Sequence, residues 1–231
     1  MALALGIASC PNATVPAMSA RDDDAWPPGV IRVPSRDRPR RLLVLLHGYG
    51  ANAADLLPFA RALSRELRDV EMLLPEGALA SPGGRAWWSV ADMNPGNRGA
   101  RIAAAGDVLT RWLDHALALR GLSDDRLVLL GFSQGAALAS DLGARRALGG
   151  VIALCGRGAE PGHGTVRTPF LLVNGARDEF ITPEAAQAQA EALRFRGASV
   201  RLSIHPHLGH GIDALALAET RAFLAAMPRS S

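Results

Sequence analysis

Residues 131–135, which read Gly-Phe-Ser-Gln-Gly, constrain the fold of this chain more than any other segment. The apolar run 126–130 before them is typical of a buried strand, and the alanine-rich run 136–142 after them is typical of a helix. The chain must therefore turn sharply at Ser133, and the small glycines on both sides relieve the crowding of that turn. This pattern predicts that the Ser133 hydroxyl stands at the carboxyl edge of a sheet.

A serine on a strand-to-helix turn resembles the nucleophile of α/β-hydrolases, in which an acid and then a histidine follow the serine along the chain. A serine hydroxyl is a weak nucleophile until a base takes its proton, and a third group must hold that base in one tautomer. An acid and a histidine are therefore expected downstream of Ser133, each just past the end of a strand.

Two acids follow the apolar strand 170–174, namely Asp178 and Glu179. The shorter side chain of aspartate holds a firmer position, and Asp178 lies nearer the strand end, so we expect Asp178 to be the acid. The alternative interpretation is that Asp178 only caps the helix that begins at Pro183. A capping residue normally lies next to the first helical turn, which argues against this alternative.

His210 is the expected base, because it lies after the acid, in a loop before the last helix. Gly209 and Gly211 flank it and let the backbone turn the imidazole toward the serine. His207 is the second choice. The histidines that precede the serine or the acid strand stand in the wrong order for this fold.

Stabilisation of the transition state requires two backbone N–H groups that face the negative charge developing on the substrate oxygen. In this fold the residue after the nucleophile supplies one, and the loop after an early strand supplies the other. The corresponding residues are Gln134 and Tyr49, the second of which follows His47 and Gly48. We expect His47 to hydrogen-bond the loop backbone and to have no catalytic role.

The residue composition excludes several chemistries. All 25 basic residues are arginine, and Tyr49 is the single tyrosine. The absence of lysine excludes a Schiff-base lysine, a Ser-Lys dyad, a phosphate-loop lysine and the Tyr-Lys pair of short-chain reductases. No dinucleotide-binding fingerprint opens a helix. A net charge of +3 with scattered arginines does not indicate a nucleic-acid partner.

Apolar runs alternate with helix-like segments from Gly29 onward, which predicts an α/β fold with a mostly parallel, doubly wound sheet. The 45 residues from Ser133 to Asp178 are too few for an inserted lid domain. We expect one α/β-hydrolase domain over residues 29–231, after a disordered tail at 1–28. The stretch 75–99 is long for a connection and predicts a functional loop. The expected strands are 30–33, 42–47, 71–74, 127–132, 150–155, 170–174 and 200–205, and the expected helices are 52–67, 97–119, 134–148, 183–195 and 212–226.

The first residues allow more than one interpretation. The segment 7–10, Ile-Ala-Ser-Cys, resembles a bacterial lipoprotein cleavage site, but no positive charge precedes it and its apolar stretch is short. We therefore expect a cytoplasmic protein, with Met1 or Met18 as the start and no integral membrane segment. Cys10 and Cys155 make neither a disulfide framework nor a metal site, and Cys155 is expected to be a small core residue.

Four motifs, at residues 46–50, 131–135, 174–178 and 209–211, together resemble the phospholipase/carboxylesterase family of α/β-hydrolases, which includes the acyl-protein thioesterases. The resemblance covers roughly residues 30–226, and the loop 51–55 is similar to the bacterial esterase branch. It implies a triad of Ser133, Asp178 and His210 with an oxyanion hole from Tyr49 and Gln134. It also implies that Trp87 and Trp88 bind substrate beside an acyl groove, for which core packing under the long loop is the alternative.

The resemblance implies a serine hydrolase that cleaves carboxylic esters or thioesters of short to medium acyl chains, including lysolipid-like substrates. It requires no metal and no organic cofactor. Two alternatives stay open, because a fold does not determine a function: cofactor-free perhydrolase or lyase chemistry on the same triad, and a non-catalytic binding protein on a hydrolase scaffold. An apolar rim is expected around the site, and it suits either substrate binding or a homodimer.

Overall fold

The computed structural model describes residues 27–158, 162 and 164–227. Most of the expected N-terminal tail, including the lipoprotein-like segment, Cys10 and both candidate start residues, lies outside these described residues.

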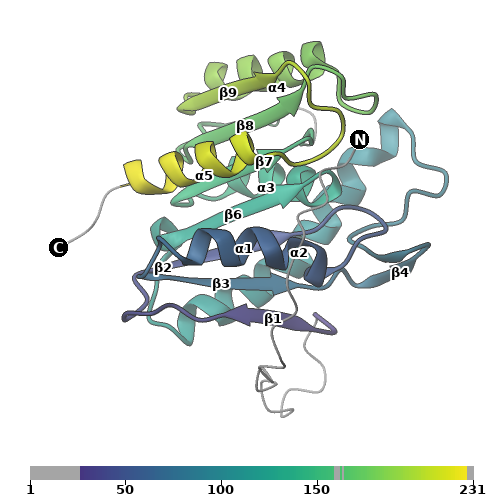
Figure 1. Ribbon diagram of the computed structural model, residues 1–231. Helices are drawn as coiled ribbons and strands as arrows, with labels where there is room; N and C mark the ends of the chain where they lie inside the picture. The colour runs from purple at the N-terminus through teal and green to yellow at the C-terminus, as the bar shows by residue number, and fades with distance from the viewer. Residues whose placement is uncertain (1–26, 159–161, 163, 228–231) are drawn as a thin grey trace.

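A seven-stranded sheet forms the centre of the described chain, in the order β1-β3-β2-β6-β7-β8-β9 (Figure 1). The strand β1 pairs antiparallel with β3, and every other neighbouring pair is parallel. The predicted α/β-hydrolase fold with a mostly parallel sheet is therefore confirmed. Strands buried on both faces explain why the central runs are apolar throughout rather than alternating. The strands are β1 (Val30–Val33), β2 (Arg41–Leu46), β3 (Val70–Pro75), β6 (Leu127–Phe132), β7 (Gly150–Leu154), β8 (Phe170–Gly175) and β9 (Val200–His205).

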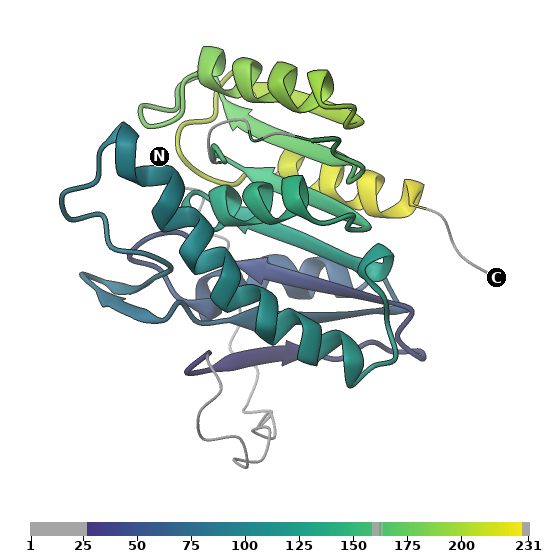
Figure 2. The same ribbon diagram turned by 180° about the vertical axis from the view of Figure 1, so that it is seen from behind.

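Helices cover both faces of the sheet. The helices α1 (Leu57–Ser64) and α5 (Ala214–Ala226) lie on the face nearer the viewer in Figure 1. The helices α2 (Pro95–Ala118), α3 (Gln134–Arg145) and α4 (Pro183–Phe195) lie on the opposite face, which Figure 2 shows. Each face has its own buried apolar cluster, so the sheet separates two cores.

Several boundaries differ from the sequence expectation for local reasons. The helix expected at 52–67 is a 3₁₀ turn, η1 (Ala53–Leu56), followed by the shorter α1. The helix α2 begins at Pro95 rather than at residue 97, because Asn94 caps it and proline fits a first helical turn. Asp213 caps α5, which therefore begins later than expected. A further 3₁₀ turn, η2 (Asp124–Arg126), leads into β6.

The expected long loop at 75–99 contains a small hairpin that the sequence did not predict. Its strands, β4 (Leu79–Ser81) and β5 (Gly84–Ala86), pair antiparallel and are too short to show an apolar alternation. An isolated bridge between Ala51 and Arg85 joins the hairpin to the loop after β2. The long connection is thus an ordered extension of the carboxyl edge of the sheet.

Parallel pairing brings the carboxyl ends of β2, β6, β8 and β9 to one edge of the sheet. The described part of the interval from Ser133 to Asp178 is used by α3, β7, β8 and their connections, and it contains no lid domain. Among the described helices, none combines the length and the apolarity that a membrane crossing needs.

Candidate active site

Ser133 lies on a strained turn between β6 and α3, with backbone angles φ 53° and ψ −111°. A non-glycine residue with positive φ is uncommon and costs free energy, which the surroundings must offset. A Cβ on Gly131 would lie 2.2 Å from the carbonyl carbon and oxygen of Gly135, and one on Gly135 would lie 2.1 Å from the carbonyl oxygen of Leu46. Only glycine fits either position, and this steric demand explains the spacing of the motif.

The structure brings Ser133, His210 and Asp178 into one hydrogen-bonded chain. The Nε2 atom of His210 lies 2.8 Å from Ser133 Oγ, and its Nδ1 atom lies 2.9 Å from Asp178 Oδ2. With the proton on Nδ1 donated to the carboxylate, Nε2 is left to accept the serine proton. The arrangement can therefore generate a nucleophilic alkoxide at Ser133.

Asp178 is held as a carboxylate. Its Oδ1 accepts hydrogen bonds of 2.9 Å from the backbone N–H groups of both Phe180 and Ile181. Burial opposes the charged form, but the hydrogen bonds from Ile181, His210 and Phe180 outweigh it and hold the pKa of Asp178 below its ordinary value. Asp178 can thus fix the imidazole in one tautomer without taking its proton.

The other candidate acid and base lie outside this chain. Glu179 is exposed, and it is the neighbouring Asp178 that meets His210. His207 is also exposed, and its Nδ1 atom lies 3.4 Å from the guanidinium of Arg177.

Two aromatic rings flank the imidazole of His210. The ring centroids of Phe132 and Phe180 lie 5.1 Å and 4.9 Å from the imidazole centroid, and Phe180 meets it edge-on. Phe180 is nevertheless 75% exposed, so it presents an apolar surface to a molecule approaching Ser133. Sequence reasoning missed Phe180, although its place two residues after the candidate acid was a usable signal.

Cys155 is a buried thiol near Asp178 and His210, as expected of a core residue. Its Sγ atom donates to the carbonyl oxygen of Gly211, 3.2 Å away. Burial raises the pKa of the thiol to about 11, so the group stays protonated at neutral pH. The possible ligand atoms of Cys155, Asp178 and His210 lie within 4.8 Å of one another, but each residue is engaged in the internal hydrogen bonds described above.

The expected oxyanion donors are Gln134, which directly follows Ser133, and Tyr49, which follows Gly48. Gln134 is the first residue of α3, where backbone N–H groups have no acceptor within the helix and the helix dipole favours negative charge. A Cβ on Gly48 would lie 3.4 Å from the Cβ of Ser133, so the loop that carries Tyr49 passes directly beside Ser133. A tetrahedral oxyanion formed at Ser133 would be close both to the N-terminus of α3 and to the loop that carries Tyr49.

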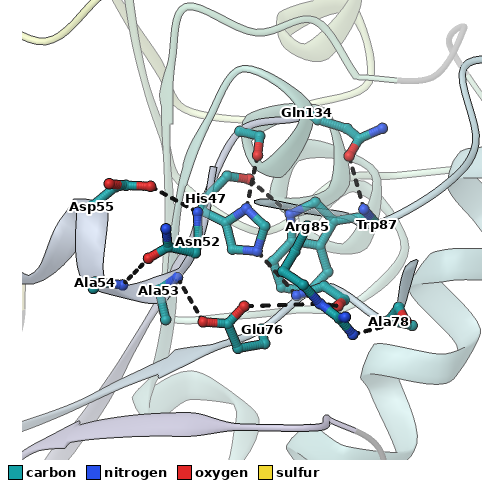
Figure 3. A network of polar contacts seen from close by, with 12 residues as sticks. His47, Asn52, Ala53, Ala54, Asp55, Glu76, Ala78, Arg85, Trp87 and Gln134 are labelled. Carbon is teal, nitrogen blue, oxygen red and sulfur yellow. Dashed lines mark hydrogen bonds and ion pairs between the residues drawn. The ribbon is translucent and has the colours of Figure 1, made fainter. Parts of the chain in front are cut away.

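His47 hydrogen-bonds the backbone of the loop that carries Tyr49 (Figure 3). Its Nε2 atom accepts from the Gly77 N–H at 3.0 Å, which leaves the proton on Nδ1 to be donated to the Gly48 carbonyl oxygen at 2.7 Å. Burial lowers the pKa of His47, in keeping with a neutral ring. The predicted structural role of His47 is confirmed.

Trp87 and Trp88 pack inside the protein rather than along an open groove. Their side chains are only 5% and 7% exposed, and they belong to the larger apolar cluster. The indole N–H of Trp87 donates to the carbonyl oxygen of His47 at 2.7 Å (Figure 3). This burial favours the packing alternative over the substrate contact that the family resemblance implies for the two tryptophans.

The side chain of Gln134 joins the tryptophan segment to the start of α3. Its Oε1 atom accepts from the Trp87 N–H at 2.8 Å, and its Nε2 atom donates to the Trp88 carbonyl oxygen at 2.9 Å. An amide carries both a donor and an acceptor, so it can make both contacts at once. Sequence reasoning assigned only the backbone of Gln134 and missed this clamp.

Arg85 of β5 connects the hairpin to the loop that carries Tyr49. Backbone hydrogen bonds of 2.9 Å and 2.8 Å link it to Gly50 and Ala51, and its guanidinium donates to the carbonyl oxygen of Gly77 at 2.8 Å. Glu76 accepts from the Ala53 N–H at 3.1 Å on the other side of the same loop (Figure 3). The loop that carries Tyr49 is therefore fixed by β4–β5 as well as by β2.

Comparisons with known proteins agree with this architecture. The sequence profile of the Phospholipase/Carboxylesterase family matches residues 30–227. Esterase YpfH of Escherichia coli (strain K12) is 33% identical over 187 residues, covering 78% of this chain and 81% of that protein. Acyl-protein thioesterase 1 of Gibberella zeae is 30% identical over 115 residues, which cover 45% of this chain and 49% of that protein.

Solved structures show the same fold. The crystal structure of esterase PE8 has a TM-score of 0.79 at 27% identity, covering 86% of this chain and 98% of that one. A carboxylesterase from Mesorhizobium loti has a TM-score of 0.70 at 26% identity, covering 81% and 89%. The chain belongs to the phospholipase/carboxylesterase family of α/β-hydrolases, and it is an esterase of the carboxylesterase/phospholipase type.

Proposed function

We propose that this esterase hydrolyses carboxylic esters or thioesters of short to medium acyl chains through an acyl-enzyme formed on Ser133. The observation that carries the proposal is the hydrogen-bonded chain from Asp178 through His210 to Ser133, with its 2.9 Å and 2.8 Å contacts. The substrate class includes small-molecule esters and lysolipid-like esters.

The reaction proceeds in two acyl transfers. In the first, Ser133 Oγ attacks the substrate carbonyl while His210 Nε2 takes the hydroxyl proton, and the N–H groups of Tyr49 and Gln134 stabilise the oxyanion. The protonated Nε2 then gives its proton to the departing alkoxide or thiolate, which leaves as the alcohol or thiol. In the second, His210 takes a proton from water, which attacks the acyl-enzyme, and Ser133 Oγ leaves with that proton. Asp178 stays ionised and holds Nδ1–H throughout.

The surroundings of His210 support an open site for the acyl and alcohol groups. The imidazole is 21% exposed, so an ester can reach the nucleophile without a lid having to open. Phe180 lies against the imidazole of His210, and both Phe180 and Tyr49 are exposed, so they could offer apolar contact to a chain of modest length. The indole N–H of Trp87 supports the start of the loop that carries Tyr49 by donating to the carbonyl oxygen of His47.

Hydrolysis of p-nitrophenyl esters from acetyl to palmitoyl tests the proposal. Ser133→Ala and His210→Ala are expected to lower kcat by at least about 10³-fold, whereas His207→Ala, in the same loop and exposed, is expected to keep the wild-type rate. A rate maximum below the palmitoyl ester supports the chain-length assignment. Equal rates in wild type and Ser133→Ala refute the assignment of Ser133 as the nucleophile. Loss of activity in His207→Ala but not in His210→Ala refutes the assignment of His210 as the base.

A further inference from the structure

The loop 206–212, which carries His210, is closed at its base by the side chain of His205. His205 is the last residue of β9, and Asp213 is the N-cap of α5. The two carboxylate oxygens of Asp213 lie 3.1 Å and 3.0 Å from His205 Nδ1. Figure 1 shows the loop leaving the end of β9 and returning to α5 on the near face of the sheet.

The second ring nitrogen of His205 faces another carboxylate. Its Nε2 atom lies 3.3 Å from Glu219 Oε2, on the second turn of α5. Ser203 donates to Glu219 Oε1 at 2.9 Å, and the guanidinium of Arg201 lies 3.3 Å from the same oxygen. His205 is only 2% exposed, so its ring is committed to these two carboxylates.

Backbone contacts connect this cluster to the segment that carries the candidate acid. The carbonyl oxygen of His205 accepts from the N–H groups of Ala176 at 2.9 Å and Leu208 at 3.3 Å. The N–H of Arg177 donates to the carbonyl oxygen of Leu208 at 2.9 Å. A Cβ on Gly175 would lie 2.1 Å from that same oxygen, so the two loops are in direct backbone contact. The loop that carries His210 is thus attached to the Asp178 segment through its backbone and to α5 through the side chain of His205.

We propose that His205 is a positioning residue for ester hydrolysis. By binding Asp213 and Glu219 it sets where the end of β9 meets the start of α5, and so holds His210 within reach of Ser133. The inference rests on the proposed function, because it requires His210 to be the base. His205 itself touches no reacting atom, and nothing in the family resemblance predicted a role for it.

Two substitutions at position 205 separate its two contacts. The amide nitrogen of asparagine falls near the place of Nδ1, so His205→Asn keeps a donor for Asp213 and loses the contact with Glu219. The amide of glutamine falls near the place of Nε2, so His205→Gln keeps the contact with Glu219 and leaves the loop open at its base. Asp213→Ser breaks the same contact from the other side, while serine still caps α5.

With p-nitrophenyl butyrate as the probe, His205→Gln and Asp213→Ser are expected to lower kcat about 10- to 100-fold, because a displacement of about 1 Å suffices for such a loss. KM is expected to stay unchanged, since acyl binding does not use this cluster. His205→Asn is expected to stay within a few-fold of the wild-type kcat. Circular dichroism and thermal unfolding give the folded fraction to which each rate is normalised.

Equal kcat values for His205→Asn and His205→Gln overturn the inference, as does a wild-type kcat in Asp213→Ser. If His205→Gln does not fold, the comparison of Asp213→Ser with His205→Asn decides the question. Ser133→Ala, measured beside them, distinguishes a failure of the positioning role from a failure of the proposed function. If Ser133→Ala is inactive while the variants at 205 and 213 keep the wild-type kcat, only the positioning role is wrong. If Ser133→Ala keeps its rate, the proposed function is wrong, and the role of His205 falls with it.

Discussion

A single methyl group at position 135 should separate the turn at Ser133 from the centre of the sheet. The Cβ of an alanine there would lie 2.1 Å from the carbonyl oxygen of Leu46 and 2.7 Å from that of His47. Real Cβ atoms essentially never approach within 3.0 Å, so α3 and β2 must move apart by about 0.9 Å. The strand β2 lies between β3 and β6 and is buried along its length, so it cannot yield freely.

We expect Gly135→Ala to lower the free energy of unfolding by about 3 kcal/mol, the upper part of the range for overpacked cores, because backbone atoms stand on both sides of the contact. For a chain of this size, such a loss lowers Tm by about 6–12 °C. The same movement shifts Ser133 and the Gln134 N–H away from the loop that carries Tyr49. A shift of this size is expected to lower kcat about 100-fold.

Thermal unfolding followed by circular dichroism, together with hydrolysis of p-nitrophenyl butyrate, measures both effects. Gly99→Ala in α2 is the matched control, because nothing lies within 4 Å of its added Cβ. That substitution should raise the free energy of unfolding by about 0.5–1 kcal/mol through helix propensity, with kcat unchanged. A wild-type Tm and kcat for Gly135→Ala would refute the steric explanation of the motif.

Three further outcomes are expected. Gln134→Glu retains an acceptor for the Trp87 N–H but sets a carboxylate against the Trp88 carbonyl oxygen, so urea denaturation should show a loss of about 1–3 kcal/mol. The ionised form of Asp178 stabilises the fold above the ordinary aspartate pKa of about 3.9, and this contribution is lost as the pH falls through its lower folded-state pKa. The free energy of unfolding should therefore fall less steeply with decreasing pH in Asp178→Asn than in the wild type. Identical slopes at acid pH would contradict the lowered pKa of Asp178. The thiol of Cys155 should resist iodoacetamide at pH 7.5 in the native protein and react in denaturant, as read by mass spectrometry of its peptide; native labelling would contradict its burial.

The strands that carry the candidate site were predictable because their sequence signals are local. The bounds of β6 and β9 match the sequence expectation, and β8 differs by one residue. The strands β6 and β8 are apolar runs, which mark parallel strands buried on both faces, whereas the edge strand β9 alternates apolar residues with Arg201 and Ser203. Once the strands are parallel, the order of Ser133, Asp178 and His210 suffices to bring their loops to one edge.

The hairpin β4–β5 and the burial of the tryptophans were not predictable in the same way. Strands of three residues show no periodicity, and the hairpin is held by contacts with a loop more than thirty residues away in the chain, through Arg85. Trp87 and Trp88 read equally well as a groove wall or as core, because an aromatic side chain suits both. Their burial in the tertiary structure, with exposed fractions of 5% and 7%, favours the core.

The amino-acid sequence by itself determined the order of strands and helices, the glycine-flanked turn at Ser133 and the exclusion of lysine chemistry. These features depend on residue type and on spacing along the chain. The tertiary structure alone decided how Gln134 clamps the tryptophan segment and that His205 is buried between Asp213 and Glu219. Such contacts depend on how far and at what angle separate elements pack, and that is set by the whole core rather than by any local pattern.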